Sequence, residues 1–225
     1  MIRFEKTSVM NMENALRGAR NPMNSWSRSD SYYDEKGRYI LGENDLSLAK
    51  RLRGAGSSDH RKLAKKLRKA GSDHRKFLRQ IFVSADITAP IYWWKEYDTY
   101  KIATVANSTS TMHKIHTKEF EIEDFSSDRL SKEGLLTLEL IIKALENTRL
   151  RYNKSRSKAD WYDIIQLLPS SYNQMRTCTL NYESLINIYF ARKNHKLDEW
   201  NSFCDWISTL PYADELIINT DRAVD

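Results

Sequence analysis

Residues 86–113 read DITAPIYWWKEYDTYKIATVANSTSTMH, and this stretch indicates most clearly how the chain folds. It begins in an apolar, β-branched run and passes through Ala89-Pro90 into an aromatic block. Proline fixes its own φ and lacks an N–H, so it suits the first turn of a helix that starts where a strand stops. The stretch predicts a strand over 80–88, a helix over 90–100 and then a nearly uncharged polar loop at a ligand site.

Helical periodicity predicts most of the remaining elements. The clearest helix spans 131–152, where apolar residues recur on one side. A strand or an extended segment is expected over 117–124, and a loop of little periodicity over 21–44. Further helices are expected over 10–20, 45–53, 159–168, 181–195 and 197–210. The fold class is α+β, dominated by helices with a small central sheet, in a single domain over residues 1–225.

A near-repeat of Gly-Ser-(Ser)-Asp-His-Arg-Lys occurs at 56–62 and again at 71–76. Glycine ends helices readily, and Ser or Asp caps the next one. The spacing predicts short helices separated by tight turns. The same region, Lys50 to Arg79, holds much of the chain's excess of +6 positive charges. It is either a solvated helix face or an anion-binding face that contacts nucleic acid or protein.

Composition narrows the classes of protein further. The chain has 225 residues, of which 40% are hydrophobic and 29% charged, typical values for a globular protein. No apolar run approaches the roughly 20 residues of a membrane span. The first residues lack a signal-peptide core, and Cys178 and Cys204 are too few for a disulfide scaffold. We therefore expect a cytoplasmic protein without a membrane partner.

Familiar catalytic and metal-binding motifs are not found in the sequence. The scattered glycines form neither a P-loop nor GxGxxG, and no nucleophile elbow is present. His113 and His116 form a close pair without cysteine or HExxH partners, so we expect no metal there. The many tyrosines and tryptophans are more typical of a core than of a stacking platform.

The order of several short segments resembles that of the flavin-dependent thymidylate synthases. An early helix ends in Ala19-Arg20, and a glycine-histidine turn follows at Gly71–His74. The Ala89-Pro90 step then precedes an aromatic helix. Leu168-Pro169 comes before the stretch NYESL at 181–185, which is similar to the family's Asn-x-Arg-Ser-Leu helix. The resemblance is collinear over the whole chain.

The resemblance implies FAD as cofactor, NADPH and methylenetetrahydrofolate as co-substrates, dUMP as the methylated nucleotide, and a homotetramer. It also implies ligand-binding residues, although capping or core hydrogen bonding is an equal interpretation for the two asparagines. The implied flavin-binding residues are His74, Lys101, Asn181 and Asn187, and the implied nucleotide-binding residues are Thr104, Asn107, Thr109 and Arg192. The chemistry needs no protein nucleophile, and no catalytic residue is assigned.

The family's arginine-rich signature is replaced in this chain. Where Arg-His-Arg is expected, the sequence has Thr99-Tyr100-Lys101, and Asn107 and Thr111 stand for a glutamate and an arginine. Each lost charged hydrogen bond costs about 1.5–3 kcal/mol. Glu183 replaces another arginine and would repel a phosphate. Compensating cations are available among Lys101, Lys114, Arg75, Arg79 and Arg192.

Three functions stay open on these grounds. The first is a divergent flavin-dependent thymidylate synthase-like protein that binds FAD and a pyrimidine nucleotide and methylates dUMP. The second is an altered enzyme that acts on another pyrimidine nucleotide. The third is a non-enzymatic reuse of the scaffold as a nucleotide-sensing, protein-binding or nucleic-acid-binding module. Whether the chain is an enzyme is left undecided.

Overall fold

The computed structural model describes residues 2–54 and 71–219. The chain divides into two compact units. Unit 1 comprises Met1–Glu5, Asp86–Tyr100 and Ala106–Cys178, and unit 2 comprises Lys6–Ala85, Lys101–Val105 and Thr179–Asp225. The single domain over 1–225 therefore stays a prediction.

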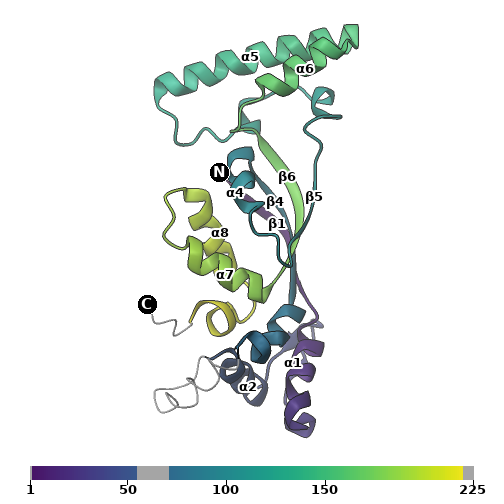
Figure 1. Ribbon diagram of the computed structural model, residues 1–225, viewed down its shortest axis with the longest axis vertical. Coiled ribbons are helices and arrows are strands. Elements are labelled where there is room, and N and C mark those ends of the chain that lie inside the picture. The colour runs from purple at the N-terminus through teal and green to yellow at the C-terminus, as the bar shows by residue number, and fades with distance from the viewer. Residues whose placement is uncertain (1, 55–70, 220–225) are drawn as a thin grey trace. The chain divides into compact units, whose positions relative to one another are not determined.

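A four-stranded sheet in the order β1-β4-β6-β5 contributes to both units. Its strands are β1 (Arg3–Met10), β4 (Phe82–Pro90), β5 (Val105–Ser108) and β6 (Asn173–Asn181), as Figure 1 shows. Thr177 donates to Asp86 Oδ1 over 2.5 Å, and the hydroxyl groups of Thr179 and Ser84 are 3.3 Å apart. Residue numbers thus rise along β6 as they fall along β4, so these neighbours run antiparallel.

The strand expected over 80–88 is confirmed as β4. Its burial alternates, with Val83, Ala85 and Ile87 buried and the residues between them partly exposed. This is the pattern of a strand with one face in a core. The helix expected after it is α4 (Ile91–Tyr97), for which Pro90 is the N-cap and not the first helical residue.

Aromatic packing in unit 1 begins with α4. Trp93, Trp94 and Tyr97 are buried, and the Trp94 indole N–H donates to the carbonyl of Gln174 over 2.9 Å.

The helix expected over 131–152 is confirmed as α5 (Lys132–Ser155), which packs beside α6 (Lys158–Leu167), as Figure 1 shows. A second core of unit 1 forms around Ile115, Phe120, Phe125, Leu138, Leu145 and Ile164.

The segment over 117–124 is not a strand. The other alternative, an extended segment, is found only between two short 3-10 turns, where Lys118 and Glu121 have extended backbones. The turns are η5 (Ile115–Thr117) and η6 (Ile122–Asp124), of which η6 is held by a capping box of Glu121 and Asp124. These local side-chain bonds compete with strand pairing. The strands β1 and β5 were not expected; their residues are mostly exposed, so the sequence has no apolar alternation there.

Unit 2 is built mainly of short helices. They are α1 (Met12–Arg20), α2 (Glu43–Arg53), α7 (Tyr182–Arg192), α8 (Asp198–Ser208), the 3-10 helices η1 (Asn21–Met23), η2 (Trp26–Arg28) and η4 (Gly71–Gln80), and the π-helix η7 (Asp214–Ile218). The expected loop over 21–44 also contains a small hairpin of β2 (Tyr32–Tyr33) and β3 (Tyr39–Ile40). The other expected helices are confirmed within a few residues.

A buried ion pair holds the first helices of unit 2 together. Arg20 Nε donates to Asp45 Oδ1 over 2.6 Å, and both side chains are almost completely buried. The second carboxylate oxygen accepts from the hydroxyl groups of Ser29 and Ser31 at 2.7 and 2.6 Å. These hydrogen bonds lower the pKa of Asp45 although burial opposes them. The arginine that ends α1 is therefore a framework residue.

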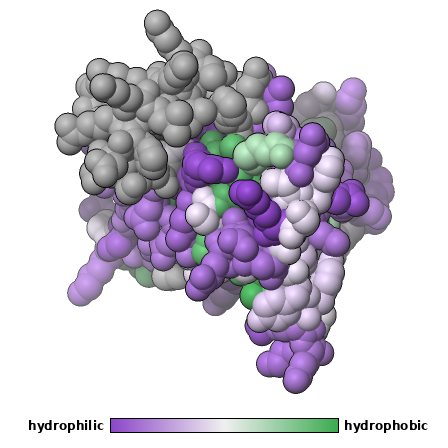
Figure 2. Space-filling model, turned by 90° about the horizontal axis from the view of Figure 1, so that it is seen from below, coloured by the Kyte–Doolittle hydropathy of each residue, from purple (hydrophilic) through white to green (hydrophobic). Residues whose placement is uncertain are grey.

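The first copy of the near-repeat lies outside the described residues. The second copy begins η4, and the short helix expected there is a 3-10 helix. Seen from below, the molecule presents a mostly hydrophilic face with small apolar areas between polar ones (Figure 2). In the described part of the chain, no helix is both long enough and apolar enough to cross a membrane.

Candidate functional site

Two segments of unit 2 contact the first turn of α7, which follows its N-cap Asn181. They are η4 and the loop Lys101–Val105. The Ser184 hydroxyl donates to the Ile102 carbonyl over 3.0 Å, and the Tyr182 N–H donates to the Ile81 carbonyl over 3.1 Å. Several residues that the resemblance assigns to ligand binding are thereby brought to one cluster, here called the α7 cluster. His74 lies in η4, but its side chain is outside the described part.

Asn181 is the N-cap of α7. Its side-chain oxygen accepts from the Ser184 N–H over 2.9 Å, and its amide nitrogen donates to the Arg79 carbonyl over 3.3 Å. The residue is 4% exposed. Both ends of the side chain are therefore engaged in the framework, which is the capping interpretation that the sequence left open. A direct role toward flavin stays a prediction.

Glu183 forms an ion pair with Arg75 of η4. One carboxylate oxygen, Oε1, lies 3.4 Å from a terminal guanidinium nitrogen of Arg75. The other, Oε2, is buried and has no hydrogen-bond partner in the described part of the chain. The Glu183 side chain is 14% exposed and that of Arg75 is 27% exposed. The charge of Glu183 is therefore balanced inside the protein, by one of the cations that the sequence offered as compensation.

The loop Lys101–Val105 is the exposed side of the α7 cluster. Lys101 is exposed and Thr104 is partly exposed. Ala103 has a φ of 54°, in the left-handed region that an L-residue other than glycine or asparagine seldom adopts. The side chain of the preceding residue, Ile102, is 87% exposed, although the backbone carbonyl of this residue accepts from Ser184. The loop thus exposes the cation Lys101 beside a backbone that is bonded to α7.

The other two predicted residues of α7 lie further along the helix. Asn187 is exposed, one turn after Glu183. The Arg192 guanidinium lies over the Trp200 ring, 4.7 Å from its centroid, at the end of α7. Stacking of this kind holds a guanidinium in place. Arg192 is therefore separated from the first turn of α7 by the length of the helix.

Asn107 and Thr109 belong to unit 1. Asn107 is an exposed residue of β5. Thr109 follows this strand and is bonded to β6: its N–H and hydroxyl group donate to the Met175 carbonyl over 2.9 and 3.2 Å. Its carbonyl accepts from the Gln174 side chain over 2.7 Å. The polar loop of the opening stretch is thus partly a sheet edge.

Neither cysteine is prepared to act as a nucleophile. Burial raises the pKa of Cys178 to about 11 and that of Cys204 to about 11, so both are protonated thiols at neutral pH. Among the described residues, no group of three or more His, Cys, Asp or Glu side chains is placed to hold a metal ion. His116 lies in unit 1, where burial and the cations Arg156, Lys114 and Arg149 lower its pKa.

Sequence reasoning missed two members of the α7 cluster. Ser184 was noted only as part of the resemblance, and Ile102 was not considered. Their bond is between a hydroxyl group and a carbonyl separated by 82 positions in the sequence. No periodicity or motif indicates such a pair. Arg75 was named as one possible cation, but its partner could not be known.

The comparisons with known proteins agree on the fold. No family model and no curated protein matches the sequence. A structure of thymidylate synthase X (ThyX) from Helicobacter pylori with FAD and dUMP matches with a TM-score of 0.64 and 16% identity, over 98% of this chain and 100% of that one. A second structure of that enzyme, a flavin-dependent thymidylate synthase complexed with FAD and dUMP, gives 0.63 and 17%, over 96% and 98%.

A third solved structure also has this fold, at lower identity. The UMP/dUMP methylase PolB from Streptomyces cacaoi, bound with 5-Br dUMP, gives a TM-score of 0.60 and 11% identity over 96% of this chain and 93% of that one. Identities this low establish the fold and leave the activity open. The α+β class, with many helices around a small antiparallel sheet, is confirmed. The chain has the fold of these nucleotide-bound enzymes.

Proposed function

We propose that the chain binds FAD and a pyrimidine nucleotide, as a divergent flavin-dependent thymidylate synthase-like protein. The observation that carries this proposal is the full-length match, which covers all of a ThyX chain crystallised with FAD and dUMP. The contacts of the first turn of α7 with η4 and the loop Lys101–Val105 support it, because they bring the predicted residue Asn181 near the segments that carry His74, Lys101 and Thr104. Methylation of dUMP is the activity that the resemblance implies.

The α7 cluster fits an anionic ligand through side chains rather than through helix amides. The N–H groups of Tyr182 and Ser184 are already bonded inside the chain, so the start of α7 does not offer them to a phosphate. Arg75 is partly exposed beside Glu183, and Lys101 is an exposed cation of the loop whose Ile102 carbonyl is bonded to Ser184. These cations would hold the flavin pyrophosphate, with reduced strength because Glu183 neutralises one of them.

The remaining roles follow the resemblance. His74 and Asn187 would bind the flavin, Arg192 the nucleotide phosphate, and Thr104, Asn107 and Thr109 the nucleotide. Flavin, when bound, supplies the hydride chemistry between NADPH, methylenetetrahydrofolate and the pyrimidine. The protein binds and orients these groups, which agrees with two cysteines that stay protonated.

Assembly into a homotetramer is also part of this proposal by resemblance. Most of the basic segment Lys50–Arg79 falls outside the described residues, so binding of nucleic acid or another protein there stays a prediction. No described contact favours the non-enzymatic function over flavin binding. We therefore carry one function forward.

A visible absorption spectrum of the purified protein tests the proposal. We expect flavin bands in the protein as isolated or after addition of FAD, and a further spectral change on addition of dUMP or UMP. Riboflavin, which lacks the pyrophosphate, is the matched control and should bind more weakly than FAD. A colourless protein whose spectrum and melting temperature do not respond to FAD would exclude the cofactor.

A further inference from the structure

His116 of unit 1 has one ring nitrogen that is buried without a partner. This atom, Nδ1, makes no hydrogen bond with the described residues, whereas Nε2 is not buried and the residue is partly exposed. A neutral imidazole carries one proton, and a buried N–H without an acceptor is rare in native proteins. The proton therefore belongs on Nε2, where the ring presents an N–H donor to solvent.

Two exposed cations lie beside this ring and form no ion pair in the described part of the chain. They are Lys114, the N-cap residue of η5, and Arg156, the C-cap residue of α5. Burial and the nearby charges of Arg156, Lys114 and Arg149 lower the pKa of His116. The Arg156 guanidinium and the His116 ring also contact the same aromatic ring, because they lie 5.4 and 5.0 Å from the centroid of Tyr152.

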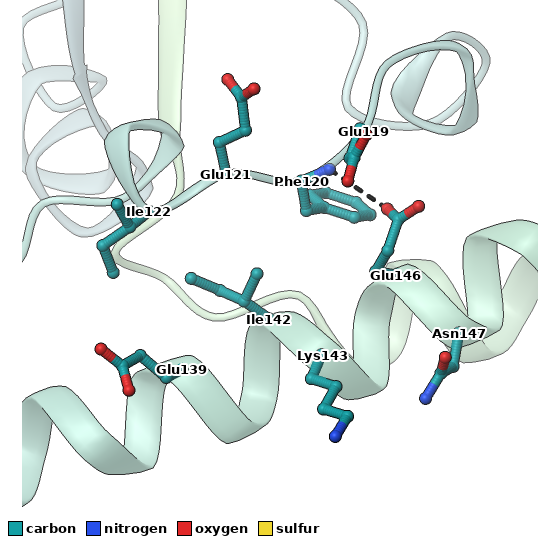
Figure 3. Close-up of a pocket in the computed structure, with 9 residues that line it drawn as sticks. All are labelled: Glu119, Phe120, Glu121, Ile122, Glu139, Ile142, Lys143, Glu146 and Asn147. Atoms are coloured by element: carbon teal, nitrogen blue, oxygen red, sulfur yellow. Dashed lines mark hydrogen bonds between the residues drawn. The ribbon is translucent and has the colours of Figure 1, made fainter.

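The carboxylates near this end of α5 already have partners. Glu146 accepts two bonds from Arg149, and Figure 3 shows it pointing to Phe120, whose N–H it accepts over 3.2 Å. Asp160 likewise has an arginine partner. Arg149 is thus neutralised, and its remaining nitrogen donates to the His116 carbonyl over 3.3 Å. The two exposed cations are left without a carboxylate to balance them among the described residues.

The backbone of Arg156 also indicates that its side chain is used. Its φ is 53°, in the left-handed region, and its N–H donates to the Tyr152 carbonyl over 2.8 Å. Glycine is the residue that adopts this conformation at the end of a helix most easily, so an arginine has a conformational cost there. Stacking on the Tyr152 ring holds the guanidinium in place.

We propose that His116, Lys114 and Arg156 form a binding site for a phosphate group, either free or carried by a small molecule. A tetrahedral oxyanion accepts from several directions, which suits an imidazole N–H, an ammonium group and a guanidinium fork. Two unbalanced cations fit one phosphate rather than the row of phosphates on a nucleic acid. The pocket of about 310 Å³ in Figure 3 is lined by four glutamates and one lysine, and it would repel a phosphate.

Sulfate is the probe for this site, because it has the shape of phosphate and a constant charge near neutral pH. Sodium sulfate added to the wild-type protein at constant ionic strength should shift the NMR signals of the His116 ring to saturation, with a Kd of about 1 mM. Sodium chloride at the same ionic strength should not. Lys114→Gln and Arg156→Gln should each weaken sulfate binding about fivefold, because each removes a charge at the surface.

The matched control is Lys132→Gln, which removes a positive charge at the opposite end of α5. It should leave the Kd for sulfate unchanged. A loss as large as that of Arg156→Gln would show that the basic chain attracts the ion as a whole, and would overturn the proposal. Shifts that do not saturate, or a Kd that neither Lys114→Gln nor Arg156→Gln changes, would also overturn it.

Two replacements of His116 test the role of its Nε2–H. His116→Gln keeps an N–H donor near the position of Nε2 and should retain most of the sulfate affinity, whereas His116→Leu should lose about fivefold. The side-chain N–H signal of Arg156 is the readout for both variants. An equal Kd for the two would show that the ring donates nothing.

The source of the phosphate is tested with inorganic phosphate and glycerol phosphate at the same concentrations. Tighter binding of the ester would identify a phosphorylated small molecule, and tighter binding of inorganic phosphate would identify the free ion. Either result agrees with the proposal, and binding of neither would contradict it. The site uses no residue of the α7 cluster, so it does not rest on the proposed flavin binding.

Discussion

Two glutamate–arginine pairs, one in each unit, differ in how completely they are bonded. In unit 1, Glu146 and Arg149 on α5 make a two-bond pair: Arg149 Nε donates to Oε2 over 2.7 Å, and a terminal guanidinium nitrogen donates to Oε1. Oε2 also accepts from the Phe120 N–H over 3.2 Å. In unit 2, Glu183 meets Arg75 at 3.4 Å through one oxygen, and its other oxygen accepts no hydrogen bond from the described residues.

This difference indicates that the Glu146–Arg149 pair stabilises the fold, whereas the Glu183–Arg75 pair contributes little to stability. Both carboxylates are mostly buried, with side chains 18% and 14% exposed. When all hydrogen-bonding positions of a buried ion pair are filled, the bonds can offset the free energy lost on removing the charges from water. When a position stays unfilled, they do not. A buried polar atom without a hydrogen bond is rare in native proteins, so its presence calls for an explanation such as a functional role or a bound water or ion. The α7 cluster is where the unsaturated pair lies.

The largest expected effect is on stability. Glu146→Gln should lower the free energy of unfolding by about 2–3 kcal/mol, because it removes charged bonds and strands Arg149. Glu183→Gln should change it by less than about 1 kcal/mol, because the lost ion pair is long and an unbonded charged oxygen goes with it. Urea titration of both variants measures the contrast. Equal losses would mean that the two pairs are equivalent.

The next largest effect is on flavin affinity, which the substitution of Glu183 should increase. Glu183→Gln should tighten FAD binding about tenfold, which is about 1.4 kcal/mol, because it frees Arg75 and removes repulsion toward the pyrophosphate. Glu146→Gln should leave the Kd unchanged. Fluorescence titration with FAD and with riboflavin tests this. A gain that is the same for riboflavin would show that phosphate is not the group concerned.

A smaller effect distinguishes framework from ligand residues inside the α7 cluster. Asn181→Ala should cost about 1 kcal/mol of stability, because it removes the cap of α7. Asn187→Ala should cost less than about 0.5 kcal/mol, since the residue is an exposed side chain. Thermal melting with and without FAD separates the two. If Asn187→Ala keeps the full melting shift with FAD, Asn187 does not bind the flavin.

The smallest effect is a change in acid sensitivity. Bonds from Arg149 hold the pKa of Glu146 below its ordinary value of 4.5. A carboxyl group whose pKa is lowered by folding stabilises the protein above its unfolded value, and this contribution is lost as the pH falls through the folded value. The stability difference between wild type and Glu146→Gln should therefore narrow from pH 7 toward pH 3. A constant difference would contradict the pair's role.

Much of the fold could be predicted from the sequence because it depends on local patterns. The strand β4 alternates between buried and partly exposed residues, and the first four turns of the helix α5 have apolar residues at helical spacing. The turns η5 and η6 were taken for a possible strand because side-chain bonds between near neighbours decided their shape. The edge strands β1 and β5 could not be predicted, since exposed strands lack an apolar pattern.

The sequence by itself determined the α+β class, the strand-proline-helix step at Ala89-Pro90 and the replacement of the arginine-rich signature. All of these depend on residue type and near neighbours. Only the tertiary structure decided that the Asn181 amide donates to the Arg79 carbonyl and that Arg75 neutralises Glu183. Each of these depends on which groups far apart in the sequence satisfy one another's charges and hydrogen bonds, or are left unsatisfied.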